Sequence, residues 1–405
     1  MSQFVCDYGA AGRPFIHSWE DTIGSGHAPL ALRADWQAQL LRCHKELGVQ
    51  RVRFHDLLSD EMGTLICENE KLLYSFFNAD RIVDYILSIG MSPFIELSFM
   101  PRTLSSGNKT VFHYNANVTP PKDYAKNVWI PEFLDFCKRN HTPADFVSTH
   151  HYPTDAFGKV GADTLTQLEH APRGIMRQQV QQARREAGDK PLYYTEWNIS
   201  SNPRDTLHDE PFAAAFVTKI IMEAQEFVQG YSFWTFSDLF EENYFPSMPF
   251  QGGFGLLNLQ GVAKPAYRAF ELLHQLGEEA LTISGSHDTV DAWVVRKGTS
   301  VTVLLTNLSM PRKPIQTELI EIRMQNTPKP SQACIQRIDE DHSNPRKLWV
   351  SLGQPAYLSA LQVGQLDAQS SLVTSALPVL WEDGNLAMKV ALPPQSVAAI
   401  TVEFA

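Results

Sequence analysis

The feature that most constrains the fold is an alternation of short apolar segments with amphipathic segments between residues 11 and 276. Strand-length apolar runs that alternate with runs of helical periodicity are typical of parallel α/β proteins. Six strands are expected, at residues 14–19, 49–58, 93–99, 146–152, 192–196 and 231–239. The glycine-rich residues 24–26 are expected to form the loop after the first strand. The predicted fold class is therefore a (β/α)8 barrel of the TIM type in which six of the eight strands are visible.

Helices are expected between these strands because apolar residues recur at helical spacing and glycines such as Gly48 and Gly90 follow the last turns. The expected helices lie at residues 32–47, 79–89, 129–139, 165–186 (one helix or two), 212–227 and 265–276.

Beyond Gly277 the pattern changes to short alternating runs that turn residues separate. Such runs predict an antiparallel β-sandwich of roughly 130 residues. The sequence thus predicts two domains, a barrel at residues 1–277 and an accessory β-sandwich at residues 278–405. The expected sandwich strands include residues 290–295, 301–307, 319–324, 347–352 and 387–392.

Composition excludes several classes of protein. With 34 basic and 45 acidic residues the net charge is −11, and no basic run could follow a phosphate backbone, so nucleic acid is not an expected partner. The five cysteines show no CxxC spacing, which favours reduced thiols over disulfides or a zinc site. The first residues lack the pattern of a secretory signal, and no segment approaches 18 consecutive apolar residues. A soluble, cytoplasmic protein without membrane contact is expected.

One carboxylate, Glu196, stands at the polar end of an apolar strand, between Thr195 and Trp197. A single glutamate at a strand end is usually a surface residue. However, polar and aromatic side chains follow the other predicted strands as well, and the carboxyl ends of barrel strands meet at one face. The expected result is a pocket rich in carboxylates and aromatic rings that suits a carbohydrate. Besides Glu196, the set comprises His17, Trp19, Glu20, His55, Asp60, Glu96, His150, Tyr152, Trp197, Asn198, Trp234, Asp238, Glu241 and Glu242.

Six segments carry long motifs in chain order: GSGHAPLALRADW at 24–36, RFHDLLSDEMG at 53–63, FIELSFMP at 94–101, STHHYP at 148–153, TEWN at 195–198 and FWTFSDLFEE at 233–242. They resemble the motifs of family 39 glycoside hydrolases, specifically the β-xylosidase branch. The resemblance implies a (β/α)8 barrel with an accessory β-sandwich that releases D-xylose from the non-reducing end of β-D-xylosides with retention of configuration.

The resemblance also assigns roles to single residues. Glu196 is implied to be the nucleophile that forms a xylosyl-enzyme. Trp234 is implied to line the sugar pocket, and hydrogen bonds to the xylose are implied for His55, His150, Tyr152, Glu241 and Glu242.

One motif of the family is missing, the Trp-Asn-Glu-Pro-Asn run that carries the acid/base. The only Asn-Glu pair of the chain is Asn69-Glu70, which Lys71 follows. Residues 120–124 (PPKDY) are followed at once by a segment that resembles a later part of the family sequence. Roughly eighty residues are therefore expected to be absent between Tyr124 and Ala125, an estimate consistent with six strands in place of eight.

Three interpretations of this gap stay open. The sequence lacks a segment that the working protein has. Alternatively, the deletion is genuine and Glu96, Glu20 or Glu241 serves as the acid. In the third interpretation the protein is a catalytically impaired pseudoenzyme that binds xylo-oligosaccharides. The first is favoured because closing six strands changes the tilt, the shear and the interior volume of a barrel together.

The expected partner is a xylo-oligosaccharide or another β-xyloside, although an iduronide or an arabinoside is not separated from it by pocket polarity. No cofactor is expected, and no metal, because the histidines lack ligand spacing and the reaction needs none. A homo-oligomer is kept as an option, since relatives are often oligomeric.

Overall fold

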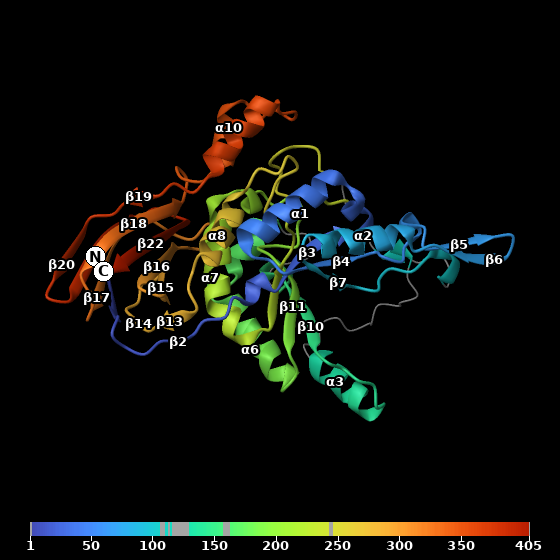
Figure 1. Ribbon diagram of the computed structural model, residues 1–405, viewed down its shortest axis with the longest axis horizontal. Coiled ribbons are helices and arrows are strands. Elements are labelled where there is room, and N and C mark those ends of the chain that lie inside the picture. The colour runs from blue at the N-terminus through green and yellow to red at the C-terminus, as the bar shows by residue number, and fades with distance from the viewer. Residues whose placement is uncertain are drawn as a thin grey trace.

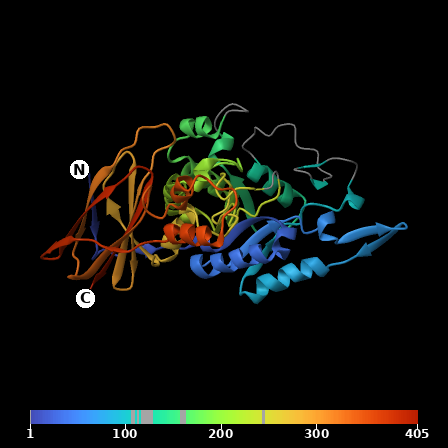
Figure 2. The same ribbon diagram turned by 90° about the horizontal axis from the view of Figure 1, so that it is seen from above.

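The computed structural model describes residues 2–105, 110–111, 114–115, 129–156, 163–242 and 246–404. An α/β unit and a β-sandwich lie side by side, with both chain ends on the sandwich (Figure 1). The view from above shows the same two parts, and the hairpin of β5 (Leu65–Glu68) and β6 (Lys71–Tyr74) extends from the α/β unit away from the sandwich (Figure 2). The expected deletion point between Tyr124 and Ala125 lies outside the described residues.

A six-stranded sheet forms the centre of the α/β unit, and every neighbouring pair of its strands is parallel. Parallel strands place all their carboxyl ends at the same edge. In spatial order the strands are β10 (Val147–His151), β11 (Leu192–Trp197), β12 (Gly230–Phe233), β3 (Thr22–His27), β4 (Arg51–His55) and β7 (Ser92–Ile95).

The sheet has two free edges, β7 and β10, which lie on either side of the expected gap and follow each other in the chain order of this parallel sheet. Among the residues that the structure describes, no strand pairs with either edge. The two edges still approach each other. The rings of Phe94 in β7 and Phe146, just before β10, lie 6.0 Å apart, and both contact the ring of Tyr193. The six strands are thus observed, whereas the closure into an eight-stranded barrel is not.

Helices cover the sheet. They are α1 (Ala34–Leu47), α2 (Phe77–Ser88), α3 (Trp129–Arg139), α4 (Pro153–Ala156), α5 (Thr164–His170), α6 (Ile175–Ala187), α7 (Pro211–Ala224) and α8 (Pro265–His274). The segment expected as one helix or two at residues 165–186 is two, α5 and α6. Helix α7 is buried on nearly all sides because it packs between α6, α8 and the sandwich strands, which explains its almost continuous apolar sequence.

The first strand of the parallel sheet differs from its prediction. The structure places it at β3, which includes Gly24 and Gly26, whereas residues 13–20 form the short β2 (Arg13–Pro14) and a 3-10 turn. A Cβ atom on Gly24 would lie 2.8 Å from Trp234 Cε3 and 2.9 Å from the Phe233 carbonyl oxygen. The glycine therefore permits close packing of two strands and does not mark a loop.

The sandwich consists of two sheets. One has the order β14-β1-β17-β21-β20 and the other β19-β18-β22-β16-β15-β13-β2. The bounds are β1 (Ser2–Asp7), β13 (Glu279–Leu281), β14 (Ile283–Ser284), β15 (Val290–Lys297), β16 (Ser300–Asn307), β17 (Glu318–Gln325), β18 (Pro330–Ile338), β19 (Ser375–Ala376), β20 (Val379–Glu382), β21 (Asn385–Leu392) and β22 (Ser396–Phe404).

Four of the five strands expected in the sandwich are present, as β15, β16, β17 and β21. The fifth, at residues 347–352, is wrong because this segment belongs to helix α9 (Pro345–Ser351). The Asn344 side chain accepts a hydrogen bond from the Lys347 amide, and Pro345 occupies the first turn, so local capping decides for a helix. A second helix, α10 (Ala360–Ser370), starts with a capping box at Ser359.

The first residues of the chain pair with the sandwich. β1 runs parallel to β17, and β2 pairs with β13. The sequence had grouped residues 1–277 as one unit. We propose a division in which residues 2–14 join residues 278–405, and residues 15–277 form the α/β unit. None of the described helices is both long enough and apolar enough to cross a membrane.

Candidate active site

The carboxyl ends of the parallel strands surround a cavity of about 460 Å³. His55 ends β4, Glu96 follows β7, Tyr152 follows β10, and Glu196 lies near the end of β11. Side chains that are far apart in sequence meet here because all six strands point the same way. The lining residues are Arg53, His55, Glu96, Phe99, His150, Tyr152, Glu196, Ser201, Trp234, Glu242 and Phe254.

Glu196 is held by three side chains. Its Oε1 accepts a hydrogen bond from Arg53 Nη1 at 2.6 Å, and its Oε2 accepts one from the Tyr152 hydroxyl at 2.9 Å. His150 Nδ1 lies 3.3 Å from the same Oε2. Both carboxylate oxygens thus face donors in a site that is largely shielded from water, and the carboxylate has one defined orientation.

The net effect of these contacts is a pKa of Glu196 below the ordinary value. Burial by itself raises this pKa, but the charges of His150 and Arg53 and the hydrogen bonds from Arg53 and Tyr152 lower it by more. Desolvation lowers the pKa of His150, whereas the charges of Glu196 and Glu96 help to raise the pKa of Arg53. Arg53 is therefore the partner that stays charged at neutral pH. Desolvation and the neighbouring Glu196 raise the pKa of Tyr152 far above its usual range, which keeps its hydroxyl a donor.

An aromatic wall forms one side of the cavity. The Trp234 ring is buried, and it stacks on His55 with a centroid distance of 6.0 Å, while the Arg53 guanidinium carbon lies 5.4 Å from its centroid. Asn198 fixes this region from behind by donating hydrogen bonds to the carbonyl oxygens of Trp234 and Phe254. A flat, rigid ring beside carboxylates is the arrangement that binds one face of a sugar.

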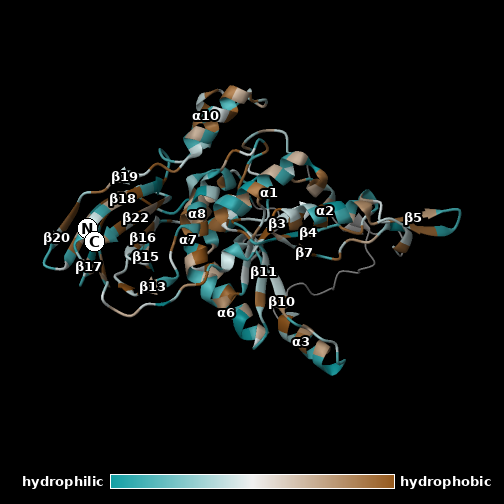
Figure 3. Ribbon diagram, in the orientation of Figure 1, coloured by the Kyte–Doolittle hydropathy of each residue, from teal (hydrophilic) through white to brown (hydrophobic). Residues whose placement is uncertain are grey.

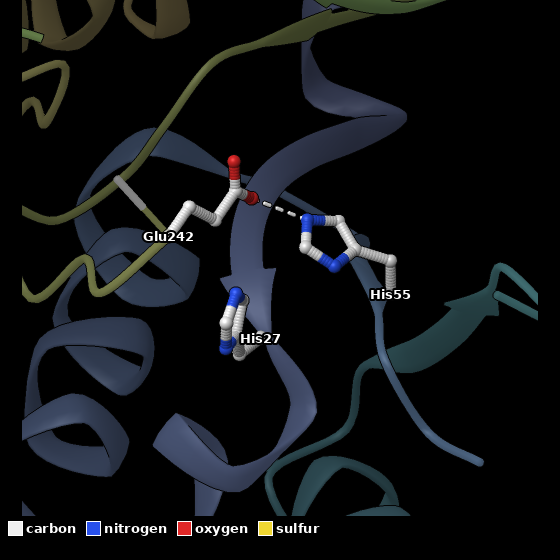
Figure 4. A group of neighbouring side chains, drawn as sticks. All are labelled: His27, His55 and Glu242. Atoms are coloured by element: carbon white, nitrogen blue, oxygen red, sulfur yellow. Dashed lines mark hydrogen bonds and ion pairs between the residues drawn. The ribbon is translucent and has the colours of Figure 1, made fainter. Parts of the chain in front are cut away.

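The two adjacent glutamates after β12 point to different places. Glu242 lines the cavity and accepts a hydrogen bond from His55 Nε2, as Figure 4 shows. Glu241 does not line the cavity, and its Oε1 accepts a hydrogen bond from Arg33 Nη1 at 3.0 Å. The structure therefore brings Glu242 into the site with the other predicted residues and places Glu241 outside it.

Other residues of the predicted set also lie away from the cavity. His17 and Glu20 contact each other at 2.6 Å, and Glu20 also contacts His274, in a separate cleft. Asp238 is buried and pairs with Lys264 at 2.7 Å. Residues at the expected first strand were misplaced because that strand begins later, at β3. Outside the cavity lining are also Trp19, Asp60, Trp197 and Asn198.

Arg53 is the main site residue that the sequence did not single out. It was visible as one of two arginines that alternate with Val52 and Phe54 in an expected strand. Residues two apart in a strand share a face, so Arg53 had to lie on the same side as His55. An arginine on the inner face of a barrel strand needs a carboxylate partner. Phe99, Ser201 and Phe254 lie in loops and gave no such signal.

The candidates for the acid/base differ in their surroundings. Glu96 lines the cavity, but Arg53 Nη2 and the Ser98 hydroxyl both donate to its carboxylate. The Asn69-Glu70 pair occupies the exposed two-residue turn of the β5–β6 hairpin, where both residues have positive φ angles. This turn pair is therefore not a substitute for the family motif.

A buried group of titratable residues lies behind His55. Burial lowers the pKa of His27 to about 3, so its imidazole is neutral. Asp56 is fully buried, and burial together with the charges of Glu61, Glu242 and Asp60 raises its pKa to about 8.

Comparison with known proteins places this geometry in a family. The family model described as Glycosyl hydrolases family 39 matches residues 5–128 and 125–385. The chain is 36% identical to a "Beta-xylosidase" of Caldicellulosiruptor saccharolyticus over 483 positions, covering 100% of this chain and 99% of the relative. It is 29% identical to a "Beta-xylosidase" of Geobacillus stearothermophilus, covering 96% and 93% of the two chains.

Solved structures agree with these relatives. A monomeric β-xylosidase from Caulobacter crescentus CB15 superposes with a TM-score of 0.82 at 25% identity, covering 100% of both chains. The enzyme described as GH39 from Xanthomonas axonopodis pv. citri superposes with a TM-score of 0.80 at 25% identity, covering 100% of this chain and 97% of that chain.

The comparisons also bear on the expected gap. The two family matches meet at residues 125–128, next to the junction that the motifs indicated. The first alignment needs 483 positions for 405 residues, which leaves at least 78 positions without a residue of this chain. This agrees with the roughly eighty residues that the motifs indicate. The two free sheet edges agree with the absence of two strands from the family barrel. With a family match over most of its length, the chain belongs to the family 39 glycoside hydrolases.

Proposed function

We propose that this chain cleaves β-D-xylosides with retention of configuration and that Glu196 is its nucleophile. The observation that supports this most is the Glu196 carboxylate, which Arg53 and Tyr152 hold ionised at the inner end of a sugar-sized cavity. A retaining glycosidase needs such an anion to form the covalent glycosyl-enzyme. The curated relatives called "Beta-xylosidase" support a xyloside as the substrate.

In this proposal the non-reducing xylose lies against Trp234, with its hydroxyl groups near the polar residues that line the cavity. His55, His150, Tyr152 and Glu242 provide donors and acceptors around the cavity. Glu241, which the resemblance also implied, is proposed to hold Arg33 instead of the sugar, because its carboxylate is engaged outside the cavity.

Cleavage also requires protonation of the leaving group. A retaining enzyme protonates the leaving oxygen with a second carboxyl group about 5–5.5 Å from the nucleophile. Within the described part of the chain, the carboxylates that line the cavity are Glu96, Glu196 and Glu242. Glu96 accepts from Arg53 and Ser98, and Glu242 accepts from His55, so each acts as an acceptor. We therefore propose that the chain as it stands cleaves xylosides whose leaving group needs no proton, and xylobiose far more slowly.

The experiment is covalent labelling with a 2-fluoro-xyloside that carries a good leaving group, followed by intact mass and peptide mapping. One adduct per chain is expected, on the peptide that contains Glu196. Glu196→Gln should give no adduct, whereas Glu20→Gln, which changes a glutamate of a separate cleft, should label as the unaltered chain does. An unlabelled but folded wild-type protein would contradict the proposal.

A binder without catalysis is the second candidate function, and the absence of a protonating carboxyl group among the described cavity residues favours it. It predicts that xylose quenches the fluorescence of Trp234 while activated aryl xylosides stay intact. Turnover of an activated aryl xyloside that Glu196→Gln abolishes would exclude it. The homo-oligomer stays a prediction, to be checked by light scattering.

A further inference from the structure

Three side chains from separate segments converge around His55 at one side of the cavity. They are His27 at the end of β3, His55 at the end of β4, and Glu242 in the loop after β12 (Figure 4). One nitrogen or oxygen atom of each lies within 4.8 Å of the others. This group could not be recognised from the sequence, because the three residues lack the short spacing of known metal motifs.

We propose that His27, His55 and Glu242 form a binding site for a divalent transition-metal ion of the Zn²⁺ class, and that the bound ion inhibits the enzyme. Two imidazoles and one carboxylate are a donor set that Zn²⁺ prefers, with a fourth position left open. Mg²⁺ and Ca²⁺ prefer sites made of oxygen atoms, so they fit this group less well.

The distances suit such an ion after a small movement. Zn²⁺ bonds of 2.0–2.2 Å in a tetrahedral site place neighbouring donor atoms about 3.4 Å apart. The donor atoms lie within 4.8 Å of one another, so the contacts of His27 would close by at most about 1.4 Å, whereas His55 and Glu242 would have to separate slightly. His55 and Glu242 already contact each other through a hydrogen bond, which the ion would replace.

The surroundings of His27 resemble those of a metal-bound histidine. Its Nδ1 faces Asp56 Oδ2 at 3.6 Å and Glu61 Oε2 at 3.9 Å, so Nε2 is the nitrogen left to face His55 and Glu242. Around a metal-bound histidine a carboxyl group usually accepts from the second ring nitrogen, and here Asp56 and Glu61 lie on that side of the ring, slightly beyond hydrogen-bond distance. The negative charges of Glu61 and Glu242 also make this region favourable for a cation.

A second group, formed by His27, Asp56 and Glu61, shares the imidazole. An ion there would bind at the other side of the imidazole, through Nδ1. One of its ligands, Glu61, has a side chain that is 65% exposed to water. We assign the ion to the inner group because it has two imidazoles in place of one and is better shielded from water. Variants of Glu61 and Glu242 separate the two positions.

Inhibition follows from the overlap with the sugar site and rests on the function proposed above. His55 and Glu242 line the cavity, whereas His27 lies behind it. An ion held by all three would withdraw both residues from the sugar. Zn²⁺ and a xyloside should therefore compete.

The test begins with binding, independent of any activity. Calorimetric titration of the full chain with Zn²⁺ should give one equivalent, and Co²⁺ should give the visible absorption of a tetrahedral site. Because outer partners of a metal site typically matter 10–100-fold, loss of a direct ligand in His27→Gln or Glu242→Gln should weaken Zn²⁺ binding by roughly 100-fold or more. The exposed His170→Gln should bind with an affinity near that of the wild type, and Glu61→Gln, which changes only an outer neighbour of His27, should weaken binding less than Glu242→Gln does.

The proposal is overturned if Zn²⁺ does not bind, if His27→Gln and Glu242→Gln bind as tightly as the wild type while circular dichroism shows them folded, or if Glu61→Gln is the variant that loses binding. The kinetic arm measures Zn²⁺ inhibition of aryl xyloside cleavage, which should be competitive. Binding at the assigned residues without competition by xylose would overturn the proposed inhibition and would also contradict the sugar position in the proposed function.

Discussion

At the scale of single residues, Arg53 connects two of the carboxylates that line the cavity, Glu196 and Glu96. One nitrogen of its guanidinium binds Glu196 and the other binds Glu96. Arginine suits this position because its planar fork can satisfy two carboxylates at once and stays charged. The ionised state of the proposed nucleophile thus depends on a neighbour from another strand.

Replacing Arg53 by Gln should therefore move the acidic limb of the pH profile. The pKa of Glu196 lies below its ordinary value in the wild type, partly through Arg53, so removal of the guanidinium raises that pKa. Because cleavage needs the anion, activity should be lost at a higher pH, with the limb of kcat/KM shifted up by about 1–3 units. The profile is measured with an activated aryl xyloside.

The matched control is Arg51→Gln on the same strand. Arg51 contacts Asp21 at 2.9 Å and does not line the cavity. The acidic limb of this variant should coincide with that of the wild type, and equal shifts in both variants would show that the effect is not specific to the site.

The adjacent glutamates give a second prediction at this scale. Glu242→Gln should raise KM for an aryl xyloside by at least about tenfold, since a hydrogen bond to a charged group typically contributes about 1.5–3 kcal/mol and about 1.4 kcal/mol corresponds to tenfold. Glu241→Gln, which changes a contact with Arg33, should leave KM within about twofold. A larger effect at Glu241 would favour the assignment implied by the resemblance over the one proposed from the structure.

At the scale of elements, the close approach of β3 and β12 positions the aromatic wall. Gly24 leaves space for Trp234 and for the Phe233 carbonyl group, and the Gly26 position faces Phe240. The strand thus contains glycines where side chains would push its neighbour away, at a cost in intrinsic strand stability.

Gly24→Ala should destabilise the α/β unit by about 1–3 kcal/mol, because the added methyl group meets backbone and ring atoms that have little room to move. Urea unfolding followed by tryptophan fluorescence measures the shift, and aryl xyloside activity should fall with it because Trp234 is displaced. The control is Gly364→Ala in α10, where the new methyl group meets nothing within 4 Å. That helix position should gain about 0.5–1 kcal/mol. Equal behaviour of the two variants would contradict the packing argument.

At the scale of the whole molecule, the free edges of the sheet expose apolar side chains. Ile95 and Leu97 near the end of β7 and the α3 residues Trp129, Phe133 and Phe136 are all more than 40% exposed. Figure 3 shows hydrophobic segments of α3 at the periphery of the α/β unit. A groove of about 330 Å³ between α3 and β10 is lined mainly by apolar residues, which include Trp129 and Phe133. Apolar surface of this kind usually packs against another element, which fits the missing-segment interpretation.

Inserting the segment of the Caldicellulosiruptor saccharolyticus relative that aligns with the gap, between Tyr124 and Ala125, should therefore raise thermal stability. If the segment brings the acid/base motif, it should also raise xylobiose hydrolysis by about 10²–10⁴-fold, the usual contribution of general acid catalysis. Activated aryl xylosides should gain much less.

The control is the same insertion with the motif glutamate replaced by Gln. It should keep the gain in melting temperature and lose the gain on xylobiose. If both insertions leave stability and activity unchanged, the six-stranded arrangement is the working state of the protein, and the deletion is genuine.

Local patterns in the sequence determined much of this protein. Helix α3 lies at the expected residues 129–139, and five of the six expected strand segments overlap a strand of the parallel sheet, because residue periodicity and glycine stops act within a few positions. Seven of the eleven residues that line the cavity were in the predicted set, since parallel strands bring their carboxyl ends to one edge. The family match then established the hydrolase class.

Only the tertiary structure decided which side chains share an environment. It separated Glu241 from Glu242, joined β1 to the sandwich, turned Gly24 into part of a strand, and brought His27 to His55 and Glu242. These outcomes depend on contacts between residues that are far apart in sequence. Local periodicity places a residue on an element, but the packing of elements decides what that residue touches.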